Sequence, residues 1–197
     1  MGEGIDLWLI RHGETEWSLN RKHTSRTDIG LTEHGRLRAE KLRDYLQGTK
    51  FTAVFTSPMK RARETCTIAG FGDVATVDEG LMEWDYGVHE GRTTEEIREE
   101  TPGWSVWKDE ISGGETVEHV GVRADEVIAR ALKAGGEGGR VALFAHAHIL
   151  RILAARWIGL NAEGGRLFAL GTGSVSVLGW ERETRVVQLW NYGFEKQ

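Results

Sequence analysis

Three segments of the sequence place a basic or imidazole side chain just after an apolar run. Arg11 and His12 follow the first run, His146 closes the run RVALFAH, and Arg61 stands shortly after the run AVFT. If these runs are neighbouring strands of a parallel sheet, their carboxyl ends meet at one edge, where α/β proteins bind ligands. We therefore expect these four side chains to converge on one site.

Such a cluster suits a phosphoryl group. The charged oxygens of a phosphoryl group can accept paired N–H bonds from two guanidinium groups. A neutral imidazole held in line can attack phosphorus. Gly13 lets the backbone come close to a ligand, and a helix starting just past His146 would direct free N–H groups at the same anion. The acid that protonates the leaving oxygen must come from elsewhere, and the segment LMEWDYG offers Glu83.

Ordinary structural roles are the alternative for each of these residues. Most arginines form surface ion pairs, and Glu79 and Asp85 stand close to Glu83 as rival carboxylates. The charged run 95–100 is typical of a solvated helix face. Eight tryptophans spread along the chain indicate core and pocket-wall positions.

The rest of the chain alternates predicted strands and helices. Strands are predicted at 5–11, 53–56, 74–77 and 140–146, with a closing hairpin at 174–180 and 185–190. Helices are predicted at 32–46, 59–69, 117–134 and 149–158, and a capping box at 93–96 opens another. This alternation predicts an α/β fold, a three-layer α/β/α sandwich with a mostly parallel central sheet.

Composition limits the class of protein. The 197 residues are 40% hydrophobic and 28% charged, which suits one globular domain. The net charge of −5 argues against a nucleic-acid partner. No apolar run is long enough to span a membrane. The single cysteine, Cys66, favours a reducing compartment, so we expect a cytoplasmic protein and treat Cys66 as a buried helix residue.

Four motifs stand in a fixed order along the chain: LIRHGETEW, TSPMKRARET, LMEWDYGVHEG and LFAHAHILR. Together they resemble the histidine phosphatase superfamily, in its phosphoglycerate mutase-like branch. The resemblance is greatest to the acid phosphatase and sugar-bisphosphatase subgroup. It implies a phosphoglycerate mutase-like fold and a single histidine phosphatase domain over residues 1–197.

The resemblance also implies roles for the clustered residues. His12 would be the nucleophile that becomes phosphohistidine. Arg11, Arg61 and His146 would hold the phosphoryl group. Glu83 would protonate the leaving alcohol and then activate water. No metal or organic cofactor is implied.

The resemblance says less about which residues bind the rest of the substrate, beyond its phosphoryl group. The family often has Asn where this chain has Ser18, and Gly where it has Ser25 and Ala147. These departures concern substrate fit more than the chemistry. The backbone N–H of Ala147 would add a donor to the phosphoryl group. The candidates for binding the rest of the substrate are Ser18, His23, Thr24, Ser25, Tyr86, Ala147 and His148.

The predicted activity is metal-independent hydrolysis of small phosphate monoesters, and three alternatives stay open. A phosphoglycerate mutase resembles this chain but typically carries a longer insertion between Glu83 and His146. A metallohydrolase would use His12, His146 and His148 as ligands, yet arginines beside a metal repel it. A non-catalytic phospholigand binder would share the fold, but such proteins usually lose the nucleophile or the acid. A homodimer through the closing hairpin is a further open alternative.

Overall fold

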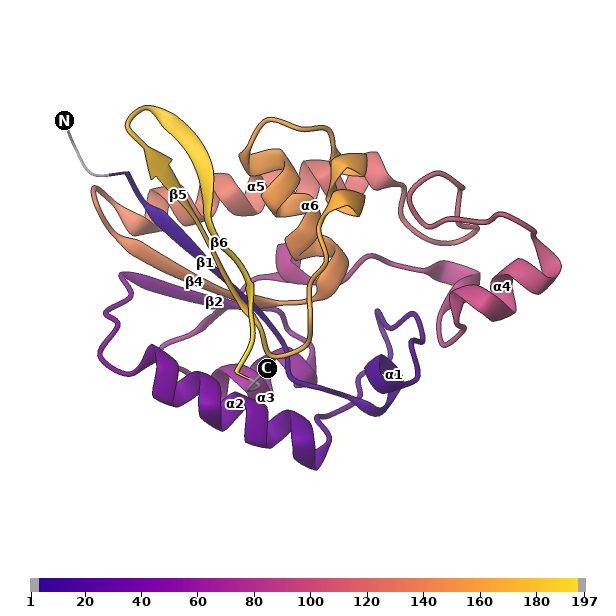
Figure 1. The fold of residues 1–197 in the computed structure, drawn as a ribbon, viewed down its shortest axis with the longest axis horizontal. Helices are drawn as coiled ribbons and strands as arrows, with labels where there is room; N and C mark the ends of the chain where they lie inside the picture. Colours follow the sequence, from indigo (N-terminus) through magenta and orange to yellow (C-terminus); the bar gives the residue numbers. More distant parts are fainter. Residues whose placement is uncertain (1–3, 195–197) are drawn as a thin grey trace.

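A six-stranded sheet forms the centre of the computed structural model, which describes residues 4–194. The strand order is β3-β2-β4-β1-β5-β6 (Figure 1). Strands β1 to β4 pair in parallel, whereas β5 and β6 extend the sheet in antiparallel fashion. The strands are β1 (Asp6–Arg11), β2 (Ala53–Thr56), β3 (Thr76–Val77), β4 (Arg140–Ala145), β5 (Val175–Glu181) and β6 (Thr184–Tyr192). The predicted mostly parallel sheet is confirmed; the ends of the predicted single domain, 1–3 and 195–197, lie outside the described residues.

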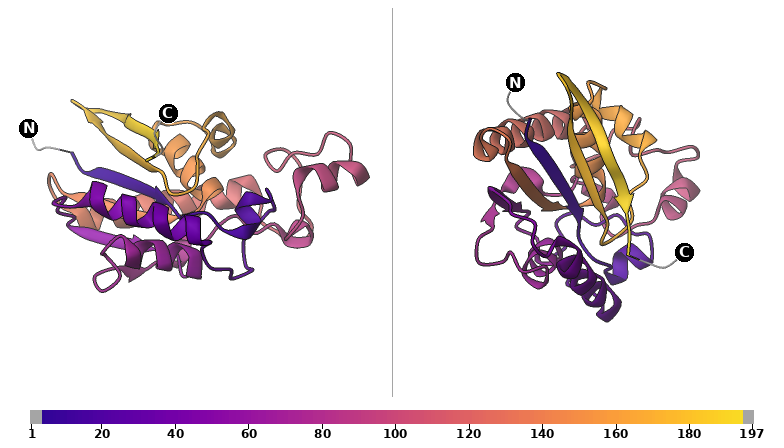
Figure 2. Two further views of the ribbon diagram at one scale, coloured as in Figure 1. Left: turned by 60° about the horizontal axis from the view of Figure 1, so that its bottom comes forward. Right: turned by 60° about the vertical axis from the view of Figure 1, so that its left-hand side comes forward.

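Helices cover both faces of this sheet, as Figures 1 and 2 show. Because successive strand residues point to opposite faces, β1 contributes to two cores. Leu7 and Leu9 pack in the cluster of the α5 and α6 face, and Ile10 packs with Leu42 and Cys66 on the α2 and α3 face. The predicted α/β/α layers are therefore confirmed. The covering helices are α2 (Glu33–Leu46), α3 (Lys60–Ile68), α5 (Val117–Gly135) and α6 (Ala147–Trp157).

One segment leaves the layers and projects from the carboxyl-terminal side of the sheet (Figures 1 and 2). We call residues 84–116 the projecting lobe; it carries η2 (Gly87–His89) and α4 (Thr94–Glu100). His23, in the loop after α1 (Glu16–Leu19), is joined to the lobe by backbone bonds with Arg92 and Gly91, each 2.8 Å long. Two further short helices are η1 (Glu79–Leu81) and η3 (Ala162–Leu167).

Most predicted elements agree with the structure to within two residues, and two of the differences bear on the sheet edge and the site. The predicted strand 74–77 is reduced to Thr76 and Val77, which pair with Phe55 and Thr56 of β2. The predicted helix 149–158 begins two residues earlier, since His146 has extended backbone and serves as the N-cap of α6. This second difference moves free N–H groups into the site. None of the helices within residues 4–194 is long and apolar enough to cross a membrane.

Candidate active site

His12 follows β1 directly, and its backbone N–H continues the sheet pairing to Ala145 at 3.0 Å. Its Nδ1 lies 2.7 Å from the carbonyl oxygen of Gly13. Because a carbonyl only accepts, Nδ1 carries the proton and Nε2 keeps its lone pair. Burial, then the charges of Arg61 and Arg11, hold the pKa of His12 well below its usual value of 6.5. His12 is therefore a neutral imidazole with the electronic state of a nucleophile.

Gly13 has a packing role that the sequence did not predict. A Cβ added there would lie 2.6 Å from the carbonyl oxygen of Gly35 in α2, so only glycine lets the two backbones touch. The N–H of Gly13 is donated to Thr65 Oγ1 at 3.0 Å. The glycine thus seats the end of β1 on α2 and α3, and its predicted approach to a ligand stays a prediction.

Arg61 and His146 lie fully buried beside His12. Arg61 Nε donates to His146 Nδ1 at 3.1 Å, so His146 Nε2 carries the proton and faces Ser57 Oγ at 2.7 Å. The rings of His12 and His146 are 5.1 Å apart. Burial and the Arg61 charge hold the pKa of His146 well below 6.5. The remaining bonds of Arg61 go to the backbone carbonyls of Thr24, Ser25 and Thr27.

Arg11 is the second predicted guanidinium, and it differs from Arg61 in lining the central cavity. Its Nη1 donates to the carbonyl of Leu170, and its buried Nε has no hydrogen-bond partner among the described residues. Burial lowers the pKa of Arg11 to about 10, partly offset by Glu83. Arg11 thus offers an unsatisfied donor beside the cavity, where an anion can accept it.

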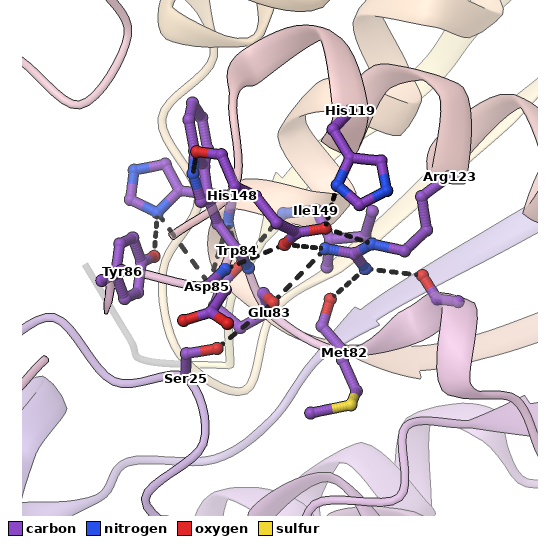
Figure 3. A network of polar contacts seen from close by, with 12 residues as sticks. Ser25, Met82, Glu83, Trp84, Asp85, Tyr86, His119, Arg123, His148 and Ile149 are labelled. Carbon is purple, nitrogen blue, oxygen red and sulfur yellow. Dashed lines mark hydrogen bonds and ion pairs between the residues drawn. The ribbon is translucent and has the colours of Figure 1, made fainter. Parts of the chain in front are cut away.

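Glu83 sits at the N-terminus of α6 and is 5% exposed (Figure 3). Its carboxylate accepts the backbone N–H groups of His148 and Ile149 at 3.0–3.1 Å, and that of Trp84 at 3.0 Å. At the N-terminus of α6, where we expected N–H groups to bind the phosphoryl group, those of His148 and Ile149 thus go to this carboxylate. Ala147, the first residue of α6, lines the cavity, and donation of its own N–H to the phosphoryl group stays a prediction.

Tyr86 and His148 form a pair beside Glu83. The Tyr86 hydroxyl lies 2.6 Å from His148 Nδ1. Burial raises the pKa of Tyr86 well above its usual value and lowers that of His148 well below its own, so the neutral phenol donates to the neutral imidazole. The ring of His23 packs on Tyr86, with centroids 4.8 Å apart. All three of these predicted residues line the cavity.

The predicted hydroxyl residues already have partners within the protein. Ser18 completes the capping box of α1 with Thr15, and Thr24 Oγ1 donates to the carbonyl of Lys22 at 2.9 Å. Both line the cavity, whereas Ser25 is not among the lining residues. Ser25 instead directs its hydroxyl at the carbonyl of Glu83, at 3.4 Å. Contact of these hydroxyls with substrate stays a prediction.

The cavity has a volume of about 470 Å³, and part of its wall was not predicted. Arg98 belongs to the charged run 95–100, which we interpreted as a solvated helix face. That interpretation is wrong for Arg98, because α4 places this side chain at the cavity wall. There its Nε donates a hydrogen bond to the carbonyl of Trp104 at 2.8 Å. Arg151 ends the motif LFAHAHILR and lies one helical turn beyond Ala147. That spacing could have predicted that Arg151 shares the cavity-facing side of the helix with Ala147. The unpredicted lining residues include Arg21, Lys22, Arg98, Trp104, Trp107 and Arg151.

Metal ligation finds little support in the histidine contacts. Both ring nitrogens of His146 face protein partners, and Nδ1 of His148 faces Tyr86. Within residues 4–194, no group of three or more His, Cys, Asp or Glu side chains is placed to hold a metal ion. The charged side chains that line the cavity are mostly positive, which suits an anionic ligand: Glu83 stands against Arg11, Arg21, Lys22, Arg98 and Arg151.

Comparison with known proteins identifies the family. The sequence profile of the histidine phosphatase superfamily (branch 1) matches residues 7–193. A Mycobacterium tuberculosis protein named acid phosphatase is 40% identical over 182 residues, covering 91% of this chain and 88% of that protein. Sedoheptulose 1,7-bisphosphatase of Saccharomyces cerevisiae is 34% identical over 187 residues, covering 79% of this chain and 68% of that protein.

A solved structure extends the similarity to the fold. The product of an open reading frame of Mycobacterium tuberculosis superposes with a TM-score of 0.89 at 36% identity, covering 95% of this chain and 97% of that one. The family and the enzyme class predicted from the four motifs, a phosphatase, are thereby confirmed. The chain belongs to the histidine phosphatase superfamily, branch 1.

Proposed function

We propose that this protein hydrolyses small phosphate monoesters, without a metal, through a phosphohistidine formed on His12. The observation that carries the proposal is the state of that imidazole: neutral, with Nδ1 bonded to the Gly13 carbonyl and its other nitrogen available. Because the His12 imidazole is already neutral, it needs no general base to activate it. The neighbouring guanidinium groups of Arg11 and Arg61 supply positive charge where the phosphoryl group would develop negative charge.

In the first step, Nε2 of His12 attacks phosphorus while the bond from phosphorus to the ester oxygen breaks. The electron pair of that bond stays on the leaving oxygen, and protonated Glu83 gives it a proton. Arg11, Arg61 and His146 hold the phosphoryl oxygens. Acid catalysis of this kind contributes about 10²–10⁴-fold, and positioning with charge stabilisation supplies the rest.

In the second step, the now ionised Glu83 removes a proton from water, which attacks the phosphohistidine. The N–P bond breaks, free phosphate leaves, and His12 returns to its neutral form. The backbone N–H groups of His148 and Ile149 hold the Glu83 carboxylate in place at this stage. One carboxyl group thus serves first as acid and then as base.

The far wall of the cavity favours certain leaving groups. Arg98 and Arg151 add positive charge to it, and the indole of Trp107 offers a flat apolar surface. We propose small soluble esters whose leaving group carries polar or negatively charged substituents. The same features would admit a phosphoglycerate, so a mutase is the second candidate. Cytoplasmic location, a single domain over 1–197 and homodimer formation stay predictions.

Phosphate release from p-nitrophenyl phosphate tests the proposal, measured with and without EDTA for the native protein and for His12→Ala. We expect release that survives EDTA and is lost in the variant. Native protein stopped with denaturant during turnover of a radiolabelled ester should retain acid-labile phosphate, and His12→Ala should retain none. Loss of native activity with EDTA would overturn the mechanism. A labelled phosphoenzyme that passes phosphate to phosphoglycerate faster than to water would favour the mutase.

A further inference from the structure

Glu83 belongs to a segment with little regular structure between η1 and η2, and a single arginine of α5 binds the backbone of that segment. Arg123 Nη1 donates to the carbonyl oxygens of Gly80 at 2.9 Å and Met82 at 2.6 Å. Its Nη2 donates to the carbonyl oxygen of Glu83 itself at 3.3 Å. Arg123 therefore fixes the chain that leads up to Glu83.

The same guanidinium forms an ion pair with Glu115. Arg123 Nε lies 3.1 Å from Glu115 Oε1, and Nη2 lies 2.8 Å from Oε2. The two side chains are only 15% and 14% exposed. With the three backbone carbonyls, this pair satisfies all five N–H donors of the guanidinium. Such a complete set of bonds is available to arginine and not to lysine, which has three donors.

Glu115 in turn binds the chain that follows Glu83. The N–H of Asp85 is donated to Glu115 Oε2 at 2.9 Å, and the Glu115 N–H is donated to the Asp85 carbonyl at 3.0 Å. The indole N–H of Trp84 reaches the Glu115 carbonyl at 2.9 Å. Figure 3 shows these contacts arranged around Glu83, with Arg123 on the opposite side from His148. Glu115 also lies near the end of the projecting lobe, so the pair joins both ends of that lobe.

We propose that Arg123 and Glu115 are positioning residues for the general acid Glu83. Neither is among the residues lining the cavity, so they act through the backbone on both sides of Glu83. A proton donor must lie within hydrogen-bond reach of the leaving oxygen, and small displacements cost rate steeply. The pair keeps the Glu83 carboxylate against the start of α6, where His148 and Ile149 bind it. This inference rests on the proposed function, because it assumes the acid role of Glu83.

Arg130, on the same helix, provides the matched control. It forms a two-bond ion pair with Asp78, both bonds 2.9 Å long, and so holds the start of η1. It makes no hydrogen bond to the carbonyls of Gly80, Met82 or Glu83 within the described structure. Arg130→Ala therefore removes an ion pair of α5 without releasing the backbone at Glu83.

The test uses the leaving-group dependence of kcat/KM, which reports steps up to phosphoryl transfer. Nitrophenolate leaves without a proton, whereas the alkoxide of ethyl phosphate needs one. The ratio of kcat/KM for ethyl phosphate to that for p-nitrophenyl phosphate is measured for native protein, Glu83→Gln, Arg123→Ala, Arg123→Lys and Arg130→Ala. Glu115→Gln, which keeps an oxygen acceptor, is added in case Arg123→Ala fails to fold, with Tm recorded for every variant.

We expect Arg123→Ala to lower this ratio about tenfold, in the same direction as Glu83→Gln. Arg123→Lys and Glu115→Gln should lower it less, and Arg130→Ala should leave it at the native value. If Glu83→Gln lowers the ratio while the Arg123 and Glu115 variants lower kcat/KM equally for both substrates, the pair is merely structural and the inference is wrong. If Glu83→Gln itself leaves the ratio unchanged, the acid role in the proposed function fails, and the positioning role fails with it.

Discussion

The two ends of the cavity are built in different ways. At the inner end, His12 lines the cavity and Arg61 and His146 lie buried behind it; all three are at most 5% exposed, Arg61 is hydrogen-bonded to His146, and the ring of His12 packs against that of His146. At the outer end, Trp107 and Arg98 come from the projecting lobe, which has little regular structure and lies away from the sheet (Figure 1). A rigid end with fixed charges suits the phosphoryl group common to all substrates. A loosely structured end suits the variable leaving group.

Substitution at the inner end should give the largest effect. Arg61→Ala removes a fully buried guanidinium and leaves three backbone carbonyls and His146 Nδ1 without their donor. We expect kcat/KM to fall about 10²–10³-fold and the free energy of unfolding to fall by about 2–4 kcal/mol. Phosphate-release kinetics and urea unfolding measure the two effects. Arg61→Lys should recover only part of either; full recovery would show that charge alone matters there.

The buried histidines in and around the cavity should also make the folded protein less stable in acid. Burial holds the pKa values of His12, His146 and His148 well below 6.5 in the folded state. Below pH 6.5 the unfolded chain therefore binds protons that the folded protein does not, so stability falls as pH falls from 6.5 toward the folded-state values. Each such histidine contributes up to about 1.4 kcal/mol per pH unit in this window. Urea unfolding of the ligand-free protein between pH 7 and 5 measures it.

A free energy of unfolding that stays constant from pH 7 to 5 would contradict neutral, buried histidines at the inner end. It would also weaken the argument that His12 is ready to act as a nucleophile.

At the outer end, Trp107→Ala should affect substrate binding more than chemistry. The indole packs against the ring of His148 at 5.1 Å and under the guanidinium of Arg151 at 4.7 Å. We expect KM for p-nitrophenyl phosphate to rise about tenfold, as when an aromatic contact is removed from a binding pocket, with kcat within a few-fold of native. A large fall in kcat with unchanged KM would contradict this prediction, because it would show that Trp107 affects the chemical step and not substrate binding.

The smallest effect is expected for Arg98→Ala. Arg98 is exposed and lies at the cavity wall, so its charge is screened by solvent. We expect a few-fold loss of kcat/KM for esters whose leaving group carries a second negative charge, and no change for ethyl phosphate. Arg63→Ala, at an exposed site of α3 outside the cavity lining, is the control for net charge. Equal losses with both kinds of ester would contradict a role for Arg98 in selecting the leaving group.

The sequence by itself determined the elements and the family. Apolar runs ending in Arg11-His12 and in His146 identified strands whose ends meet, because parallel strands align their carboxyl ends. β1 and β4 do pair directly, with Arg11 opposite Ala145. The four ordered motifs identified the superfamily. The capping box at Thr93 also predicted the start of α4, since a cap depends on neighbouring residues alone.

Only the tertiary structure decided how the donors are distributed. The N–H groups of His148 and Ile149 at the start of α6 bind Glu83, because Glu83 is brought there by a chain that α5 holds from far along the sequence. For the same reason the sequence did not predict Arg98 in the wall or the Arg123–Glu115 pair. Both depend on where the projecting lobe leaves and rejoins the body. Local patterns specify local structure, whereas long-range hydrogen bonds between irregular segments have no periodic signal in the sequence.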